Sequence, residues 1–94
     1  MSQVWQLIPR SLLLWRVWDD EIVVYNVASG DTHHLDPLTS EAFDILLQSP
    51  ADAAELAQRI ATSLDVERSD ELDNAVELIV RRFQGSGLVE PVLT

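Results

Sequence analysis

The hydrophobic pattern of this chain changes its period at Asp36-Pro37, and this change limits the possible folds more than any other feature. Short runs of branched and aromatic residues occur between Leu12 and Leu35, and this composition is typical of β-strands. In such strands, successive side chains point to opposite faces. After Pro37, apolar residues recur at helical spacing. The order favours an α+β fold in which a small sheet precedes a set of helices.

The first half of the chain is predicted to form an antiparallel meander. We expect strands at 12–18, 21–27 and 31–35, separated by Asp19-Asp20 and by Ser29-Gly30-Asp31. Aspartate is a common turn residue, and glycine adopts the positive φ that tight turns need. Because the connections are short, neighbouring strands most simply pair with each other.

The regions that flank the meander are predicted to be extended. A short strand or an extended arm is expected at 4–8, where Pro9 ends the apolar run. An extended apolar tail is expected after Gly85-Ser86-Gly87, the segment that ends the last helix. No internal repeat is visible, and the length of 94 residues predicts a single domain, 1–94.

Capping residues mark the first two predicted helices. Asp36 can cap a helix that has Pro37 at its first position, which predicts a helix over 37–48. Ser49 and Pro50 repeat this arrangement and predict a second helix over about 50–63.

The third predicted helix carries the clearest amphipathic pattern. Ser69 caps it, and Arg81 and Arg82 fall in its last turn, where cations suit the helix dipole. Leu78 and Val80 lie off the centre of its apolar stripe and widen the apolar face. The stripe itself, which is typical of a helix packed on a core, consists of Leu72, Ala75, Val76, Ile79 and Phe83.

The charge of the chain argues against nucleic-acid binding. There are 16 acidic and 6 basic residues, a net charge of −10, and most of the acids fall between 36 and 77. Nucleic-acid affinity depends mainly on contacts between cations and phosphates, which such a surface disfavours. Basic or neutral peptides are more compatible partners. No secretory signal and no run long enough to span a membrane is visible, so we expect a cytoplasmic protein without a membrane partner.

Two polar clusters contain the residue types of metal or catalytic sites. Adjacent side chains on a strand point to opposite faces, so His33 and His34 are not expected to bind one metal ion together. We expect one to be packed and the other solvated. The acids of Asp19-Asp20-Glu21 belong to one turn and do not converge on a point. The chain has no cysteine and no nucleophile or phosphate-loop motif, so no enzyme activity, metal or cofactor is expected.

Trp15 and Trp18 occupy one predicted strand at an odd spacing and therefore lie on opposite faces. They cannot both point into one core. Trp18, at the end of the strand, is the better candidate for an exposed or interface position.

Several segments resemble a known family. THHLDPLTSEAFDILL, the capped second helix and the closing FQGSGLVEP are similar to the PqqD-like peptide chaperones, also called RiPP recognition elements. WDDEIVVYN and SGDTHHLDP resemble more narrowly the members that accompany an HPr-kinase-related protein. The resemblance covers about residues 12–92 and rests on a hydrophobic pattern and a strand-Asp-Pro-helix join. The order of elements is that of a winged helix-turn-helix with a three-stranded antiparallel sheet followed by three helices.

The resemblance implies a non-catalytic protein that binds the leader segment of a ribosomally made precursor peptide and presents it to a modifying enzyme. In that family, the leader adds as a strand to the third strand, in a cleft closed by the third helix. A free sheet edge is independently suited to such strand addition. Carried over to this chain, the strand side is Thr32, His33, His34 and Leu35, and the helix side is Asp73, Val76, Glu77, Val80 and Arg81.

Two other functions remain open at this point. A winged-helix DNA-binding regulator fits the order of elements, although Asp70 and Glu71 would meet phosphates at the start of its third helix. A dimeric structural adaptor would use the free edge and the arm around Trp5 for self-association. A homodimer is therefore a possible assembly of this chain.

Overall fold

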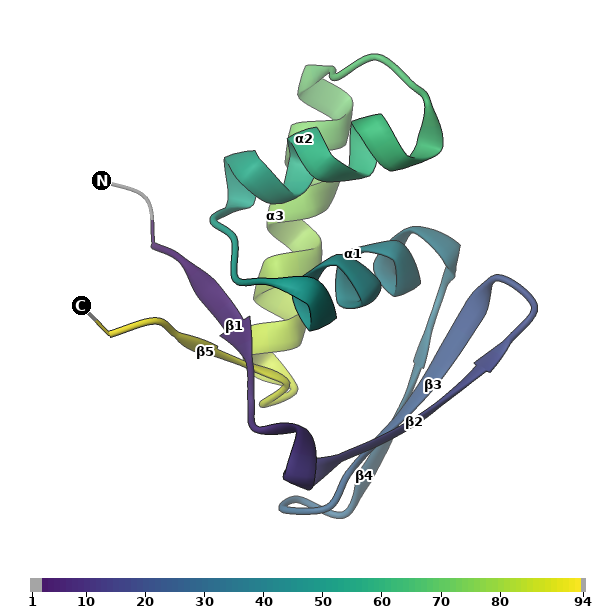
Figure 1. The fold of residues 1–94 in the computed structure, drawn as a ribbon, viewed down its shortest axis with the longest axis vertical. Coiled ribbons are helices and arrows are strands. Elements are labelled where there is room, and N and C mark those ends of the chain that lie inside the picture. The colour runs from purple at the N-terminus through teal and green to yellow at the C-terminus, as the bar shows by residue number, and fades with distance from the viewer. Residues whose placement is uncertain (1–2, 94) are drawn as a thin grey trace.

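The computed structural model describes residues 3–93 and has the predicted α+β architecture (Figure 1). Residues 1, 2 and 94 of the predicted domain lie outside the described part. Along the chain the elements are β1 (Trp5–Leu7), the 3-10 helix η1 (Arg10–Leu12), β2 (Leu13–Trp18), β3 (Glu21–Asn26), β4 (Asp31–Leu35), α1 (Pro37–Gln48), α2 (Ala53–Leu64), α3 (Asp70–Gly85) and β5 (Val89–Pro91).

The meander is confirmed, with β3 between β2 and β4. Trp18 pairs with Glu21 across the first turn, and Ile22 pairs with Leu35. Asp19 and Gly30 adopt φ values of 55° and 80°, the left-handed conformation that these tight turns require. Figure 1 shows α1 lying against one face of this sheet, and no helix of residues 3–93 covers the other face.

The predicted arm and tail form a second sheet. β1 and β5 pair antiparallel, with Trp5 opposite Pro91 and Leu7 opposite Val89. Trp5 also exchanges backbone hydrogen bonds with Ala51, over 2.9 and 3.1 Å. The β1–β5 pairing joins the two ends of the described chain, and the Trp5–Ala51 hydrogen bonds attach them to the connection between α1 and α2. The sequence did not predict either interaction.

The predicted caps of α1 and α3 are confirmed. The Asp36 carboxylate accepts a hydrogen bond from the Thr39 N–H over 2.8 Å, and the Ser69 hydroxyl accepts one from the Leu72 N–H over 3.2 Å. Each bond satisfies a backbone donor that the first turn of a helix leaves free.

The predicted start of α2 is wrong. The helix begins at Ala53 rather than at residue 50, and its cap is Asp52, which forms a reciprocal capping box with Glu55. Ala51 is held in an extended bridge to Trp5, so the backbone cannot turn into a helix before residue 52. The Ser49 hydroxyl accepts a hydrogen bond from Arg59 instead.

The core lies between the covered face of the sheet and the apolar stripes of the three helices. Phe43 packs edge-on against both Phe83 and Trp15, with ring centroids 6.5 and 6.0 Å apart. Trp18 is 68% exposed on the uncovered face, which confirms the expectation for this residue. Within residues 3–93, no helix is long and apolar enough to cross a membrane. The largest fully buried side chains are Phe43, Phe83, Leu35, Leu56, Ile60, Leu88, Val24 and Val76.

Candidate functional site

β4 forms one edge of the sheet, since it pairs only with β3 among the described strands. The Ser40 hydroxyl shows which way its backbone points. It accepts a hydrogen bond from the Ile22 N–H over 2.8 Å and donates one to the Leu35 carbonyl over 3.0 Å. Leu35 therefore turns its backbone groups toward β3. Because this direction alternates along an antiparallel strand, Thr32 and His34 turn theirs away from the sheet.

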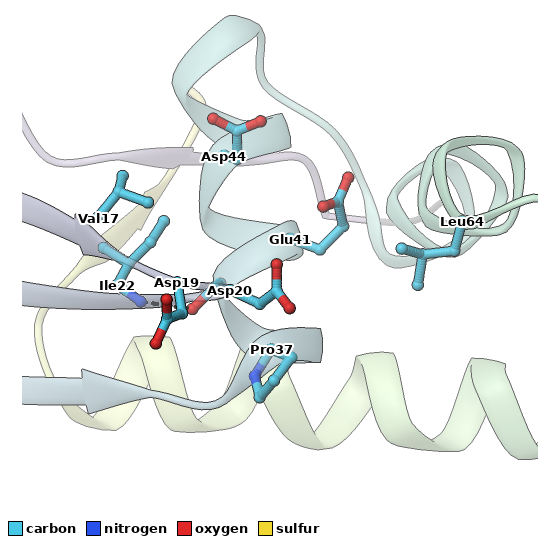
Figure 2. A pocket seen from close by; sticks show the side chains of 9 residues that line it. Val17, Asp19, Asp20, Ile22, Pro37, Glu41, Asp44 and Leu64 are labelled. Atoms are coloured by element: carbon cyan, nitrogen blue, oxygen red, sulfur yellow. Dashed lines mark hydrogen bonds between the residues drawn. The ribbon is translucent and has the colours of Figure 1, made fainter.

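The side chain of Arg82 on α3 reaches this edge. Its Nη2 donates a hydrogen bond to the His34 carbonyl over 2.8 Å, so the helix lies beside the free edge. Figure 2 shows the strand that leads to Pro37 running beside this helix. We call the free edge of β4, together with the flank of α3 that carries Arg82, the β4–α3 seam.

Helical spacing identifies the other residues on this flank. Leu78, Ala75 and Glu71 precede Arg82 by about one, two and three turns and share its side of α3. Leu78 is 63% exposed. The helix side of the seam therefore offers an exposed apolar side chain and, about one turn further on, a cation.

The helix positions expected from the resemblance lie on other sides of α3 than Arg82. Val76 and Val80 were expected to lean outward but are only 0% and 7% exposed, because both pack into the core. Glu77, Val80 and Arg81 line a hollow with Trp5, on the flank of α3 that faces β1 and the start of α2. Glu77, Val80 and Arg81 therefore lie close to one another, but not beside β4.

Asp73 also lies away from Arg82 around the helix and accepts a hydrogen bond from Arg68 Nε over 2.9 Å. The sequence reasoning missed Leu78 and Arg82 as the helix side of the seam. The available signal was Leu78 itself, an apolar residue outside the centre of the buried stripe. An apolar side chain that the core does not use often marks a binding surface.

The four expected strand residues do lie together on β4. Thr32 and His34 are exposed, His33 is half-buried and Leu35 is buried. The expectation that one histidine is packed and the other solvated is confirmed. The His33 Nε2 atom is buried without a hydrogen-bond partner among the described residues. Such an atom is unusual in a folded protein.

Asp36 links the seam to α1. Hydrogen bonds from Thr39 lower the pKa of the Asp36 carboxyl group, and the nearby positive charge of Arg82 lowers it further, while burial opposes them. The carboxylate thus stays charged at neutral pH. It is committed to the helix cap.

A groove lies where the turn between β2 and β3 meets α1 and the end of α2 (Figure 2). This groove has a volume of about 490 Å³, and no basic side chain lines it. Two of its carboxylates, Asp19 and Asp20, come from the turn and the other two, Glu41 and Asp44, from α1. The Glu41 carboxylate accepts a hydrogen bond from Ser63. The Ser40 hydroxyl both accepts and donates a structural hydrogen bond, so it is not free to act as a nucleophile. The lining residues are Val17, Asp19, Asp20, Ile22, Pro37, Ser40, Glu41, Asp44 and Leu64.

The described residues 3–93 contain no group of three or more His, Cys, Asp or Glu side chains placed to hold a metal ion. What the seam offers is backbone hydrogen bonding, one cation and apolar surface. Groups of this kind are the ones that strand addition of an extended peptide uses in general.

Comparisons with known proteins support the fold. No family model matches the chain, and no curated protein does. Among solved structures, the chain is similar to TbiB1, determined in complex with the TbiA(beta) leader peptide. The TM-score is 0.75 and the identity is 18%, over 95% of this chain and 99% of that one. The two proteins therefore share an α+β fold over nearly their whole lengths.

Proposed function

We propose that this chain is a non-catalytic peptide-binding protein of the RiPP recognition element kind. It binds the leader segment of a ribosomally made precursor peptide as an added strand on β4. The observation that carries the proposal is the free edge of β4 with α3 beside it. The shared fold with TbiB1, whose solved structure contains a leader peptide, supports it.

The backbone of β4 can supply only part of the affinity. Thr32 and His34 each turn one N–H and one carbonyl outward, and four such bonds contribute about 4 kcal/mol at about 1 kcal/mol each. Micromolar binding requires about 8 kcal/mol. Side-chain contacts must supply the remainder and offset the cost of association. The exposed Leu78 is the apolar contact that the helix side of the seam offers.

The assignment of site residues changes accordingly. Thr32 and His34 contribute backbone groups, and His33 contributes its half-buried ring. Leu35 is buried and supports the strand without touching the peptide. On the helix side, we propose Leu78 and Arg82 in place of the residues first expected.

As a second step, we propose that the bound leader is presented to a modifying enzyme. A protein with this role acts where the precursor is synthesised, so we infer a cytoplasmic location. The narrower resemblance to members that accompany an HPr-kinase-related protein stays a prediction.

A titration of the ¹⁵N-labelled protein with a leader peptide encoded beside its gene tests the proposal. We expect the largest amide shifts at Thr32 and His34 and along 78–82, because the peptide adds to that edge. Amides of the acidic groove, such as that of Asp44, serve as the internal control and should move little. If the shifts avoided both sides of the seam, strand addition to β4 would be excluded.

A further inference from the structure

Arg82 already occupies part of the binding edge in the free protein. Its guanidinium donates to the His34 carbonyl, one of the acceptors that an added strand needs. The neighbouring Arg81 lies on the other flank of α3, in the hollow that contains Trp5. Of these two neighbouring arginines, only Arg82 faces the seam.

The charge of Arg82 has no ion-pair partner in residues 3–93. The two ion pairs formed there join Arg59 to Glu55 and Arg68 to Asp73. Asp36 is close enough for the charge of Arg82 to act on its pKa, but its carboxylate is committed to the cap of α1. Arg10, Arg16 and Arg81 form no ion pair among these residues either. What distinguishes Arg82, in a chain with a net charge of −10, is that its guanidinium donates to a backbone carbonyl of the β4 edge.

We propose that Arg82 is a specificity-determining residue of the seam, which covers the His34 carbonyl in the free protein and pairs with a carboxylate of the leader in the complex. The inference rests on the proposed function and adds the chemical class of the ligand to it.

The chemistry of the side chain leads to this assignment. When a peptide N–H bonds to the His34 carbonyl, the guanidinium loses its present acceptor or must share it. Arginine has five donors and no acceptor, and its planar fork matches a carboxylate better than any other group in a peptide. A charge-assisted, two-bond pair is also stronger than a neutral hydrogen bond. An acidic residue in the leader therefore replaces the lost contact.

The spacing on α3 adds a sequence pattern. Leu78 and Arg82 lie four residues apart, which is about 6 Å along a helix at about 1.5 Å per residue. Residues i and i+2 of an extended peptide face the same side and lie about 6.8 Å apart. A leader that contacts both side chains carries an apolar residue and an acidic residue two positions apart.

Selection from a displayed library of random 12-residue peptides tests the proposal without knowledge of the natural leader. The library is selected on the wild-type protein, on Arg82→Gln, on Arg82→Glu and on Arg81→Gln as the matched control. We expect peptides from the wild type and from Arg81→Gln to be enriched in Asp or Glu two positions from an apolar residue. Arg82→Gln should lose the acidic preference, and Arg82→Glu should replace it with Lys or Arg.

A double-mutant cycle separates specificity from support of the fold. For a peptide selected on the wild type, changing its acid to the amide should weaken binding about tenfold to the wild-type protein and less than about twofold to Arg82→Gln. An equal loss for both proteins, or the same acidic preference in Arg82→Glu, would overturn the proposal.

Amide shifts of Thr32 and His34 show which of the two proposals has failed. If selected peptides move these amides but carry no acidic preference, the role of Arg82 is refuted and strand addition stands. If no selected peptide moves them, strand addition to β4 is refuted, and the role of Arg82 with it.

Discussion

Among the described strands, β2 and β4 each pair only with β3, but the surroundings of their outer edges differ. The Val27 N–H donates to the Leu12 carbonyl over 2.8 Å, so Leu12 faces β3. By alternation, the backbone groups of Trp15 and Val17 point outward from β2. Val17 is 64% exposed at this edge. At β4, by contrast, α3 lies alongside and Arg82 contacts the edge directly.

The comparison indicates what turns an edge into a selective site. Main-chain hydrogen bonds are the same for every peptide sequence, so the backbone groups of an edge do not by themselves discriminate among peptides. The flank of α3 beside β4 adds an apolar side chain and a charge, and these can discriminate among peptide sequences. The two edges thus serve as matched experimental and control surfaces within one molecule.

The largest expected effect comes from blocking each edge in turn. Thr32→Pro removes an outward N–H from β4 and places a ring where the added strand must approach, while the pairing with β3 is kept. We expect leader binding to weaken about hundredfold, because the ring obstructs the strand as well as removing a donor. Val17→Pro makes the same change on β2 and should weaken binding less than about twofold. Calorimetric titration of both variants measures this, and equal losses would contradict the assignment of the edge.

Ser40→Ala is expected to loosen β4 and leave β2 in place. The substitution leaves the buried Ile22 N–H without its acceptor, which costs about 1–3 kcal/mol of unfolding free energy. Urea unfolding measures the loss, and hydrogen exchange should show faster opening of β4 than of β2. Ser63→Ala removes an exposed hydroxyl that contacts Glu41 and serves as the control, with an expected loss below about 0.5 kcal/mol.

The smallest effect concerns Asp36, which ends β4 and caps α1. Asp36→Ala should cost about 1 kcal/mol at pH 7, whereas Asp36→Asn keeps a capping side chain and should cost less. The pKa of Asp36 is lower in the folded protein than in the unfolded chain, so its charge stabilises the fold above about pH 4. This stability is lost as the pH falls through the folded-state pKa. Urea unfolding at pH 7 and pH 3 should therefore show the gap between wild type and Asp36→Asn narrowing in acid.

Predictions that depended on nearby residues agree well with the structure. The cap at Asp36 acts on Thr39, three positions away, and the helix that follows spans 37–48 as predicted. The turns at Asp19 and Gly30 depend on the φ of single residues. The predicted start of α2 was wrong because Trp5, far away in the chain, holds Ala51 in an extended bridge.

The strand side of the candidate site could be predicted from the sequence, but the helix side could not. The position of the last run of the meander places Thr32–Leu35 at a free edge. The apolar stripe of the third helix indicates which face packs inward. It does not indicate which neighbour lies along each flank of that face, so Glu77 and Arg81 were expected where Leu78 and Arg82 lie.

By itself, the sequence determined the change from strand to helix at Asp36-Pro37, the turns, two of the three helix caps and the buried faces, because these depend on periodicity and on hydrogen bonds within a few residues. Only the tertiary structure decided that β1 pairs with β5, that α2 starts after Asp52, and that Arg82 rather than Arg81 faces β4. These features depend on how complete elements pack against one another. Segments far apart in the chain meet there, and no local pattern records which of them will be neighbours.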